Sequence, residues 1–161
     1  MAVTPKVRMF LVEHRILRCS RSFDLVHDAL VASVPALRPE LAEMLARGER
    51  AEIEAARRTL PKLWLFVGRD HGSLTAADGL KSKARQYEIG NPLTAERMTR
   101  YRLAAGLYAP LRVILYENGR GRAVFEYDLP SSLFAQFGDA RVTAVGFELD
   151  EELEAALQAA A

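Results

Sequence analysis

The dipeptide Asp70-His71 is the strongest candidate for acid–base or ligand chemistry in this sequence. Imidazole titrates near neutral pH, and a carboxylate beside it can fix its tautomer and raise its basicity. The pair follows an apolar run at residues 63–67 and would lie where a strand ends. Asp128 ends another predicted strand and could also orient His71, so His71, Asp70 and Asp128 are the candidate catalytic residues. The alternative is a His71 that bonds loop backbone and shapes the turn before Gly72.

Tyrosines on two predicted strands are candidates for the wall of a ligand pocket. Tyr87 and Tyr127 combine an apolar ring with a hydroxyl tip, which suits a pocket between a sheet and its helices. A single histidine can be an axial haem ligand, so a haem-like cofactor held by His71 is one specific version. The alternative for both tyrosines is core packing.

The other reactive residues form none of the strong catalytic motifs. The sequence has no P-loop, G-x-S-x-G, H-E-x-x-H or C-x-x-C pattern. One cysteine and three histidines exclude an internal disulfide and a Cys-based zinc site, and we predict no metal. His14 and His27 are interpreted as structural. Arg97, Arg100 and Arg102 would either hold an anion or form a solvated helix surface.

The hydrophobic pattern predicts the elements that position these residues. Strands are expected at residues 7–19, 63–67, 83–89, 111–116 and 122–127. Helices are expected at 22–34, 39–48, 49–59, from 92 to Pro110, from 131 to 138, and in one or two segments after 142. The clearest signal is Asn118-Gly119 between two β-rich runs, which is typical of a hairpin.

The order of these elements predicts an α+β fold. Adjacent strands and segregated helices indicate a two-layer domain, with a mainly antiparallel sheet of about five strands and helices chiefly on one face. The continuous apolar run at 63–67 favours an interior strand. Because the 161 residues contain no linker or repeat, we predict a single domain spanning residues 1–161.

Composition excludes several functional classes. The chain is 50% hydrophobic and 27% charged with a net charge of +1, which argues against a nucleic-acid partner because such sites need strong positive charge. No apolar run is long enough for a membrane span. The apolar run at residues 9–12 ends at Glu13, too early for a signal peptide, so we expect a cytoplasmic protein.

Charge and apolar side chains are unevenly distributed. Residues 1–21 hold five basic residues and one acidic residue, whereas the tail from Asp139 holds six acidic residues and one basic residue. Apolar side chains also exceed what one small layer needs, namely Tyr101, Leu107, Tyr108, Phe134 and Phe137. We predict a two-fold homodimer, because isologous pairing uses both features.

Several stretches resemble the bacterial family called "domain of unknown function 302". Residues 68–72, Gly-Arg-Asp-His-Gly, resemble its Asp-His signature. Residues 87–92 are similar to its Phe-Gly-Asn-Pro stretch, with Ile89 where Phe is common. Residues 109–117 resemble its Leu-Pro-Leu-Lys-Val-Leu-Val strand, and residues 126–130 its Tyr-Asn-Asp-Pro end. The resemblance covers about residues 18–161, with a helical insertion at about 39–59. It implies a compact, dimeric α+β domain and no reaction.

Two functions of different class follow. The first is a non-catalytic or sensor-like module that binds a small, largely apolar ligand or cofactor between sheet and helices, with His71, Tyr87 and Tyr127 as binding residues. The second is a small acid–base enzyme, of the isomerase or lyase kind, that uses His71 with Asp70 or Asp128.

Overall fold

Five antiparallel strands form the single sheet of this structure, a computed structural model that describes residues 4–48, 50–56, 59–76, 79 and 82–161. The strands are β1 (His14–Arg18), β2 (Trp64–Asp70), β3 (Ala84–Gly90), β4 (Leu111–Glu117) and β5 (Ala123–Asp128). Their order across the sheet is β1-β5-β4-β3-β2, and each neighbouring pair is antiparallel. The predicted α+β class is confirmed.

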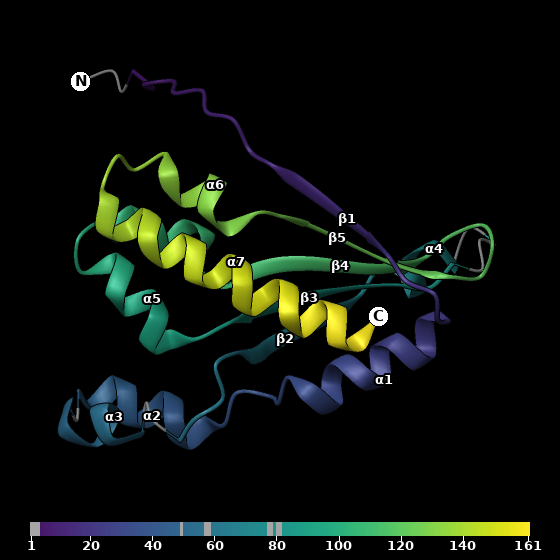
Figure 1. The fold of residues 1–161 in the computed structure, drawn as a ribbon, viewed down its shortest axis with the longest axis horizontal. Coiled ribbons are helices and arrows are strands. Elements are labelled where there is room, and N and C mark those ends of the chain that lie inside the picture. Colours follow the sequence, from purple (N-terminus) through teal and green to yellow (C-terminus); the bar gives the residue numbers. More distant parts are fainter. Residues whose placement is uncertain (1–3, 49, 57–58, 77–78, 80–81) are drawn as a thin grey trace.

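The helical elements are α1 (Phe23–Ser33), α2 (Pro39–Arg47), α3 (Arg50–Ala56), α4 (Gly72–Ala76), α5 (Pro92–Thr99), the 3-10 helix η1 (Leu103–Tyr108), α6 (Pro130–Ala135) and α7 (Ala140–Ala160). Those that give side chains to the core on one side of the sheet are α1, α5, η1, α6 and α7. The long helix α7 lies across the sheet with α1 beside it, while α2 and α3 lie apart from this pair (Figure 1). None of the helices in the described ranges is long and apolar enough to cross a membrane.

The layer between the sheet and these helices is the hydrophobic core. Alternate residues of a strand point to opposite faces, so each strand gives one set of side chains to this layer. Leu115 and Phe125 lie opposite each other on β4 and β5, and both are completely buried. Leu153 and Leu157 of α7 belong to the same cluster. The opposite face of the sheet, which we call the open face, carries more polar and exposed side chains.

The predicted hairpin is confirmed as β4 and β5. Its turn is held by the Asn118 side chain, whose Oδ1 accepts hydrogen bonds from the backbone nitrogens of Arg120 and Arg122. The residue with positive φ is Gly121, at 71°, and not Gly119. The loop is therefore longer than the two-residue turn that Asn-Gly suggests.

Two strand predictions are wrong in extent or position. The expected strand at 7–19 is a strand only over β1, because β5 ends at Asp128 opposite His14 and the strand pairing stops there. We call residues 4–13 the arm. The expected interior strand is the outermost strand, β2. Trp64 at its start is nevertheless buried and Leu65 is half-buried, because residues 35–37 bond to Leu65 along its outer edge.

The helix expected from residue 92 to Pro110 is two elements, because α5 ends at Thr99 and η1 follows. Its start is as predicted: Asn91 Oδ1 accepts a hydrogen bond from the backbone nitrogen of Leu93 at 2.9 Å, and Pro92 takes the first helical position. The helix expected at 49–59 is α3, with residues 49, 57 and 58 outside the described residues.

Candidate functional site

Asp70 and His71 build a turn and do not contact each other through their side chains. The Asp70 carboxylate accepts a hydrogen bond from the backbone nitrogen of Ser73 at 3.1 Å, at the start of α4. The backbone nitrogen of His71 donates to the carbonyl oxygen of Ala84 at 2.9 Å, which extends the pairing of β2 with β3. The imidazole is exposed and has no hydrogen-bond partner among the described residues. Asp70 therefore does not fix the tautomer of His71.

Asp128 lies at the opposite end of the sheet from His71. Because neighbouring strands alternate in direction, the end of β2 lies beside the start of β3, whereas the end of β5 lies beside the start of β4. Two strands, β3 and β4, also separate β2 from β5. The structure therefore does not bring the third predicted carboxylate to His71.

Tyr87 and Tyr127 lie in one row on the helix-covered face, with Val113 paired to both. Both tyrosines are buried, and burial raises the pKa of Tyr87 to about 12. His27 Nδ1 lies 2.6 Å from the Tyr87 hydroxyl, while Nε2 lies 3.3 Å from an Arg85 guanidinium nitrogen. Arg85 can only donate, so Nε2 accepts and Nδ1–H donates to Tyr87. This supports the structural interpretation of His27.

Replacing His71 is expected to leave folding intact. The imidazole has no side-chain partner, so His71→Ala should change the free energy of unfolding by less than about 0.5 kcal/mol. Urea unfolding of the two proteins measures this difference. A loss of several kcal/mol would show that the ring belongs to a buried network.

A different cluster of titratable side chains lies on the open face. His14 Nδ1 lies 2.9 Å from Asp128 Oδ1, and His14 Nε2 lies 3.1 Å from Glu126 Oε2. The Tyr116 hydroxyl donates to Glu126 Oε1 at 2.6 Å. We call His14, Tyr116, Glu126 and Asp128 the His14 cluster. It joins β1, β4 and β5, and Asp128, a predicted site residue, belongs to it.

The cluster favours a protonated His14. Only imidazolium can donate from both ring nitrogens at once, and the hydrogen bonds to Asp128 and Glu126 raise the pKa of His14 above its usual value. The hydrogen bonds from Tyr116 and His14 in turn lower the pKa of Glu126. The cluster thus favours a cation held between two carboxylates.

The His14 cluster should make stability depend on pH in a defined window. A raised folded-state pKa means that the stabilisation from His14 is fully present below its unfolded pKa of about 6.5 and is lost as pH rises through the raised value. Since the side chain is 49% exposed, the effect should stay below about 1 kcal/mol.

An NMR titration of the His14 ring protons in wild type should give a pKa above 6.5. Comparison of unfolding in wild type and His14→Asn should show a difference that fades over the same pH range. A midpoint at or below 6.5 would contradict the bridging arrangement.

The His14 cluster borders a hollow of about 280 Å³ on the open face. Its wall includes His14, Gln86, Arg112, Ile114, Glu126 and Asp128. Arg112 is exposed, and its guanidinium forms no ion pair or hydrogen bond with any described side chain. The Gln86 amide is half-buried and likewise has no partner in the described part of the chain. The hollow therefore offers unused hydrogen-bonding groups beside a charged cluster.

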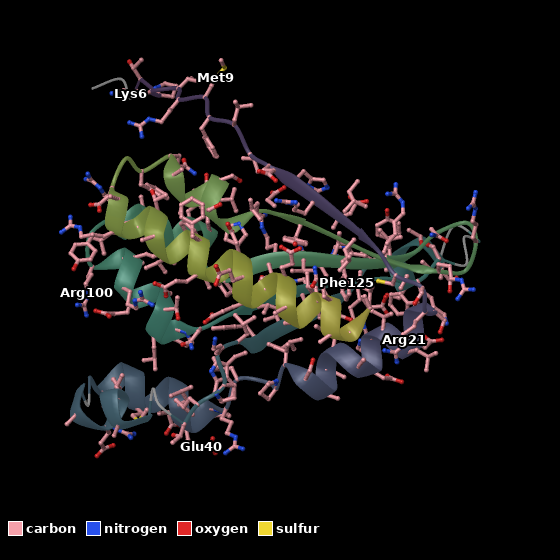
Figure 2. All side chains as sticks on the ribbon, viewed as in Figure 1. Lys6, Met9, Arg21, Glu40, Arg100 and Phe125 are labelled. Carbon is pink, nitrogen blue, oxygen red and sulfur yellow. The ribbon has the colours of Figure 1, made fainter. Side chains whose placement is uncertain are left out.

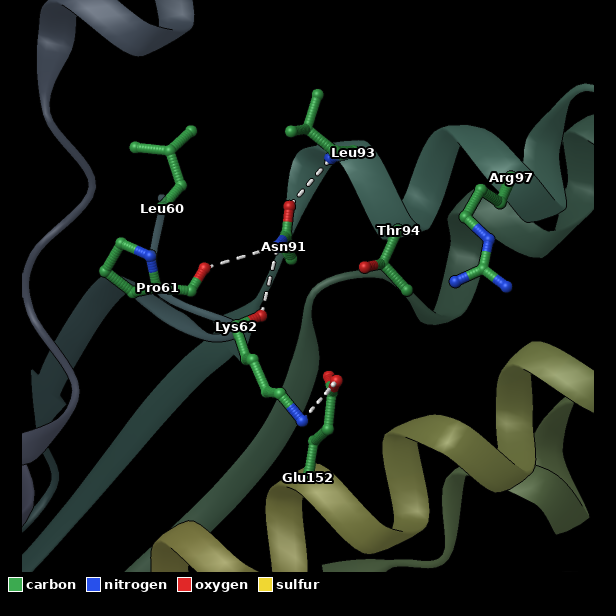
Figure 3. Close-up of a pocket in the computed structure, with 8 residues that line it drawn as sticks. All are labelled: Leu60, Pro61, Lys62, Asn91, Leu93, Thr94, Arg97 and Glu152. Atoms are coloured by element: carbon green, nitrogen blue, oxygen red, sulfur yellow. Dashed lines mark hydrogen bonds and ion pairs between the residues drawn. The ribbon is translucent and has the colours of Figure 1, made fainter. Parts of the chain in front are cut away.

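A second hollow, of about 250 Å³, lies between α5, α7 and the segment before β2 (Figure 3). Its polar groups largely bond to one another. Asn91 Nδ2 donates to the carbonyl oxygen of Lys62 at 3.1 Å, and Lys62 Nζ lies 3.7 Å from Glu152. Arg97 donates to both oxygens of Glu148, at 2.6 and 2.8 Å. This hollow offers fewer free groups than the one on the open face.

The three arginines considered for an anion site each have a carboxylate partner. Arg97 bonds to Glu148, Arg100 to Glu96, and Arg102 lies 3.8 Å from Asp139. The pairs Arg97–Glu148 and Arg102–Asp139 also use part of the charge of the acidic tail within one chain. Among the described residues, no group of three or more His, Cys, Asp or Glu could hold a metal ion.

The sequence held one signal for the His14 cluster. Glu126 and Asp128 are two residues apart on a predicted strand, so they had to share a face. Their contact with His14, 114 positions away from Asp128, depends on β1 pairing with β5, which no local pattern specifies.

Comparison with known proteins agrees with this architecture. The family model described as "Domain of unknown function DUF302" matches residues 62–160, more than half of the chain. The chain belongs to the DUF302 family. The crystal structure of an uncharacterized conserved DUF302 protein from Bacillus stearothermophilus is similar in fold, with a TM-score of 0.66 and 14% sequence identity. The similarity covers 92% of this chain and 98% of that one. No curated protein matches the chain.

Two stretches that suggested DUF302 membership have structural roles here. In Asp70-His71-Gly72, Asp70 bonds the start of α4, and Gly72 lies against the backbone of residues 82–84. In Gly90-Asn91-Pro92, Asn91 begins α5 and holds the segment before β2. The Arg112 guanidinium and the Gln86 amide, which have no partner among the described residues, lie instead on the open face.

Proposed function

We propose that this DUF302 protein is a non-catalytic module that binds a small polar molecule on the open face of its sheet. The observation that carries the proposal is the hollow beside the His14 cluster, where Arg112 and Gln86 have no partner within the described chain. Ligand sites combine a concave surface with a few convergent polar groups. A volume of about 280 Å³ favours a small ligand.

Two features of the core support a ligand site on the open face of the sheet rather than on the helix-covered face. The tyrosines expected to line a pocket, Tyr87 and Tyr127, are packed among core side chains. His71, the residue expected to hold a haem-like ligand, lies at the end of β2 and outside that core. The residues proposed for an apolar site between sheet and helices are thus not gathered around one cavity.

Binding without reaction is favoured by the state of His14. A general base needs an imidazole nitrogen with a free lone pair, within reach of a substrate proton. Both nitrogens of His14 are engaged by carboxylates, at 2.9 and 3.1 Å. Asp70 and Asp128, the carboxylates proposed to assist His71, bond to Ser73 and His14 instead.

A blocking substitution tests the binding proposal. Ile114 lies in the hollow and is half-buried, so Ile114→Trp should fill it. Ligand-observed NMR with a set of small polar metabolites should detect compounds that bind wild type and lose binding in this variant. The control Leu25→Trp changes an exposed position on α1 and should retain them. Equal binding to both variants, or no binding by any compound, would contradict the proposal.

We also propose that the chain forms a homodimer through the arm. Val7, Met9 and Leu11 are 83, 91 and 93% exposed, an apolar row on an extended segment. Figure 2 shows Met9 projecting from the arm, away from the helices. Phe10 packs edge-on against Tyr108 of η1, with ring centroids 6.3 Å apart, so the arm lies beside the exposed Leu107. An isologous contact with a second copy would cover both apolar surfaces.

Light scattering should give twice the 17.9 kDa chain mass at micromolar concentration. The double variant Met9→Ser, Leu11→Ser should give a monomer, while Leu74→Ser, at an exposed position on α4, should remain dimeric. A wild-type mass of 17.9 kDa would exclude the dimer.

A further inference from the structure

We infer that the ligand of the open-face hollow is a small organic acid that also carries a hydroxyl or ammonium group. This inference rests on the proposed function and specifies the chemistry of the same site. The acid group would bind Arg112, and the hydroxyl or ammonium group would donate to Asp128.

The register of the hairpin places these two residues together. Val113 pairs with Tyr127, so Arg112 and Asp128 lie at adjacent positions of β4 and β5 and on the same face. Both line the hollow, yet no ion pair joins them. A ligand can bridge two groups that face one cavity without contacting each other.

Arg112 specifies the anionic end of the ligand. A guanidinium presents several N–H donors in a plane and matches carboxylate geometry with two parallel hydrogen bonds. Arg69, another arginine of the open face, already donates to Glu88 at 2.6 Å and would have to leave this partner. Arg112 has no such bond to break.

Asp128 specifies the donor end. Its Oδ1 accepts from His14, while Oδ2 accepts no hydrogen bond from any described residue. Glu126 is different, because its two oxygens are bonded to His14 and Tyr116. Asp128 Oδ2 can therefore accept a hydrogen bond from a hydroxyl or ammonium group of the ligand. The Gln86 amide on β3 can form a further hydrogen bond with the ligand.

Four small, closely related probes separate these requirements. Lactate and alanine carry a carboxylate with a hydroxyl or an ammonium group, propionate lacks the donor, and lactamide lacks the charge. Titrations followed by protein NMR should show lactate or alanine binding at least about fivefold more tightly than propionate and lactamide, since hydrogen bonds to charged groups are among the stronger ones. Arg112→Gln should remove this preference, whereas the matched control Arg69→Gln should keep it.

The outcomes distinguish the ligand class from the site. If lactamide or propionate binds as well as lactate and alanine, and Ile114→Trp abolishes that binding, the ligand class is wrong and the open-face site stands. The ligand class is also overturned if Arg112→Gln and Arg69→Gln bind lactate and alanine equally. If Ile114→Trp alters the binding of none of the probes or metabolites, the proposed function and this inference fall together.

Discussion

Phe125→Ala should destabilise the protein by about 3–5 kcal/mol, the usual cost of removing a buried aromatic ring from a packed core. Phe125 is completely buried between Leu17 and Leu115 on the neighbouring strands, in the layer that α7 covers (Figure 2). For a chain of this length, each kcal/mol lowers the melting temperature by about 2–4 °C, so the loss should exceed roughly 6 °C. Calorimetry measures it.

Leu25→Ala is the control for this substitution. Leu25 lies on α1 and is 53% exposed, so its removal should change stability by less than about 0.5 kcal/mol. If Phe125→Ala were as mild as Leu25→Ala, the layer between sheet and helices would not be a packed core. The layer would then have room for a ligand, and the argument for a binding site on the open face would fail.

Gly72→Ala should destabilise the protein by about 1–3 kcal/mol, because the position has no room for a Cβ atom. An added Cβ would overlap the carbonyl oxygen of Ser82 and lie 3.0 Å from the backbone nitrogen of Ala84. Both atoms belong to backbone at the start of β3, so the β2–β3 end must shift to accept the methyl group. Chemical unfolding compares the variant with wild type.

Gly119→Ala provides the matched control, since nothing lies within 4 Å of a Cβ at that turn position and its φ is not positive. It should be neutral within about 0.5 kcal/mol. If both glycine variants were equally stable, the DUF302-like Asp-His-Gly stretch would not be explained by close backbone packing.

Local signals in the sequence predicted local structure well. The Asn118-Gly119 hairpin and the Asn91-Pro92 helix start depend on neighbouring residues, and both are present. The α+β class followed from the order of such elements. The bounds of β1 did not, because a strand ends where its partner ends, and β1 is paired with β5.

The candidate site could be predicted only in part for the same reason. Asp70 and His71 are adjacent in sequence, but the Asp70 carboxylate accepts from Ser73 whereas the His71 ring has no partner among the described residues, since successive side chains at a strand end point to opposite faces. Asp128 lies in a cluster of titratable groups, but its partner there is His14 on the neighbouring strand β1 and not His71. The unpaired state of Arg112 depends on the spacing of all its neighbours, and no sequence pattern carries that information.

The binding site on the open face is tested most directly by mapping a bound ligand onto the protein by NMR. With wild-type protein and the tightest compound from the metabolite screen, the largest shift changes should fall on His14, Arg112, Ile114 and Asp128. Resonances of Val26 and Leu153, in the core beneath α1 and α7, should change little. Largest changes at His71, or in that core, would contradict a binding site on the open face of the sheet.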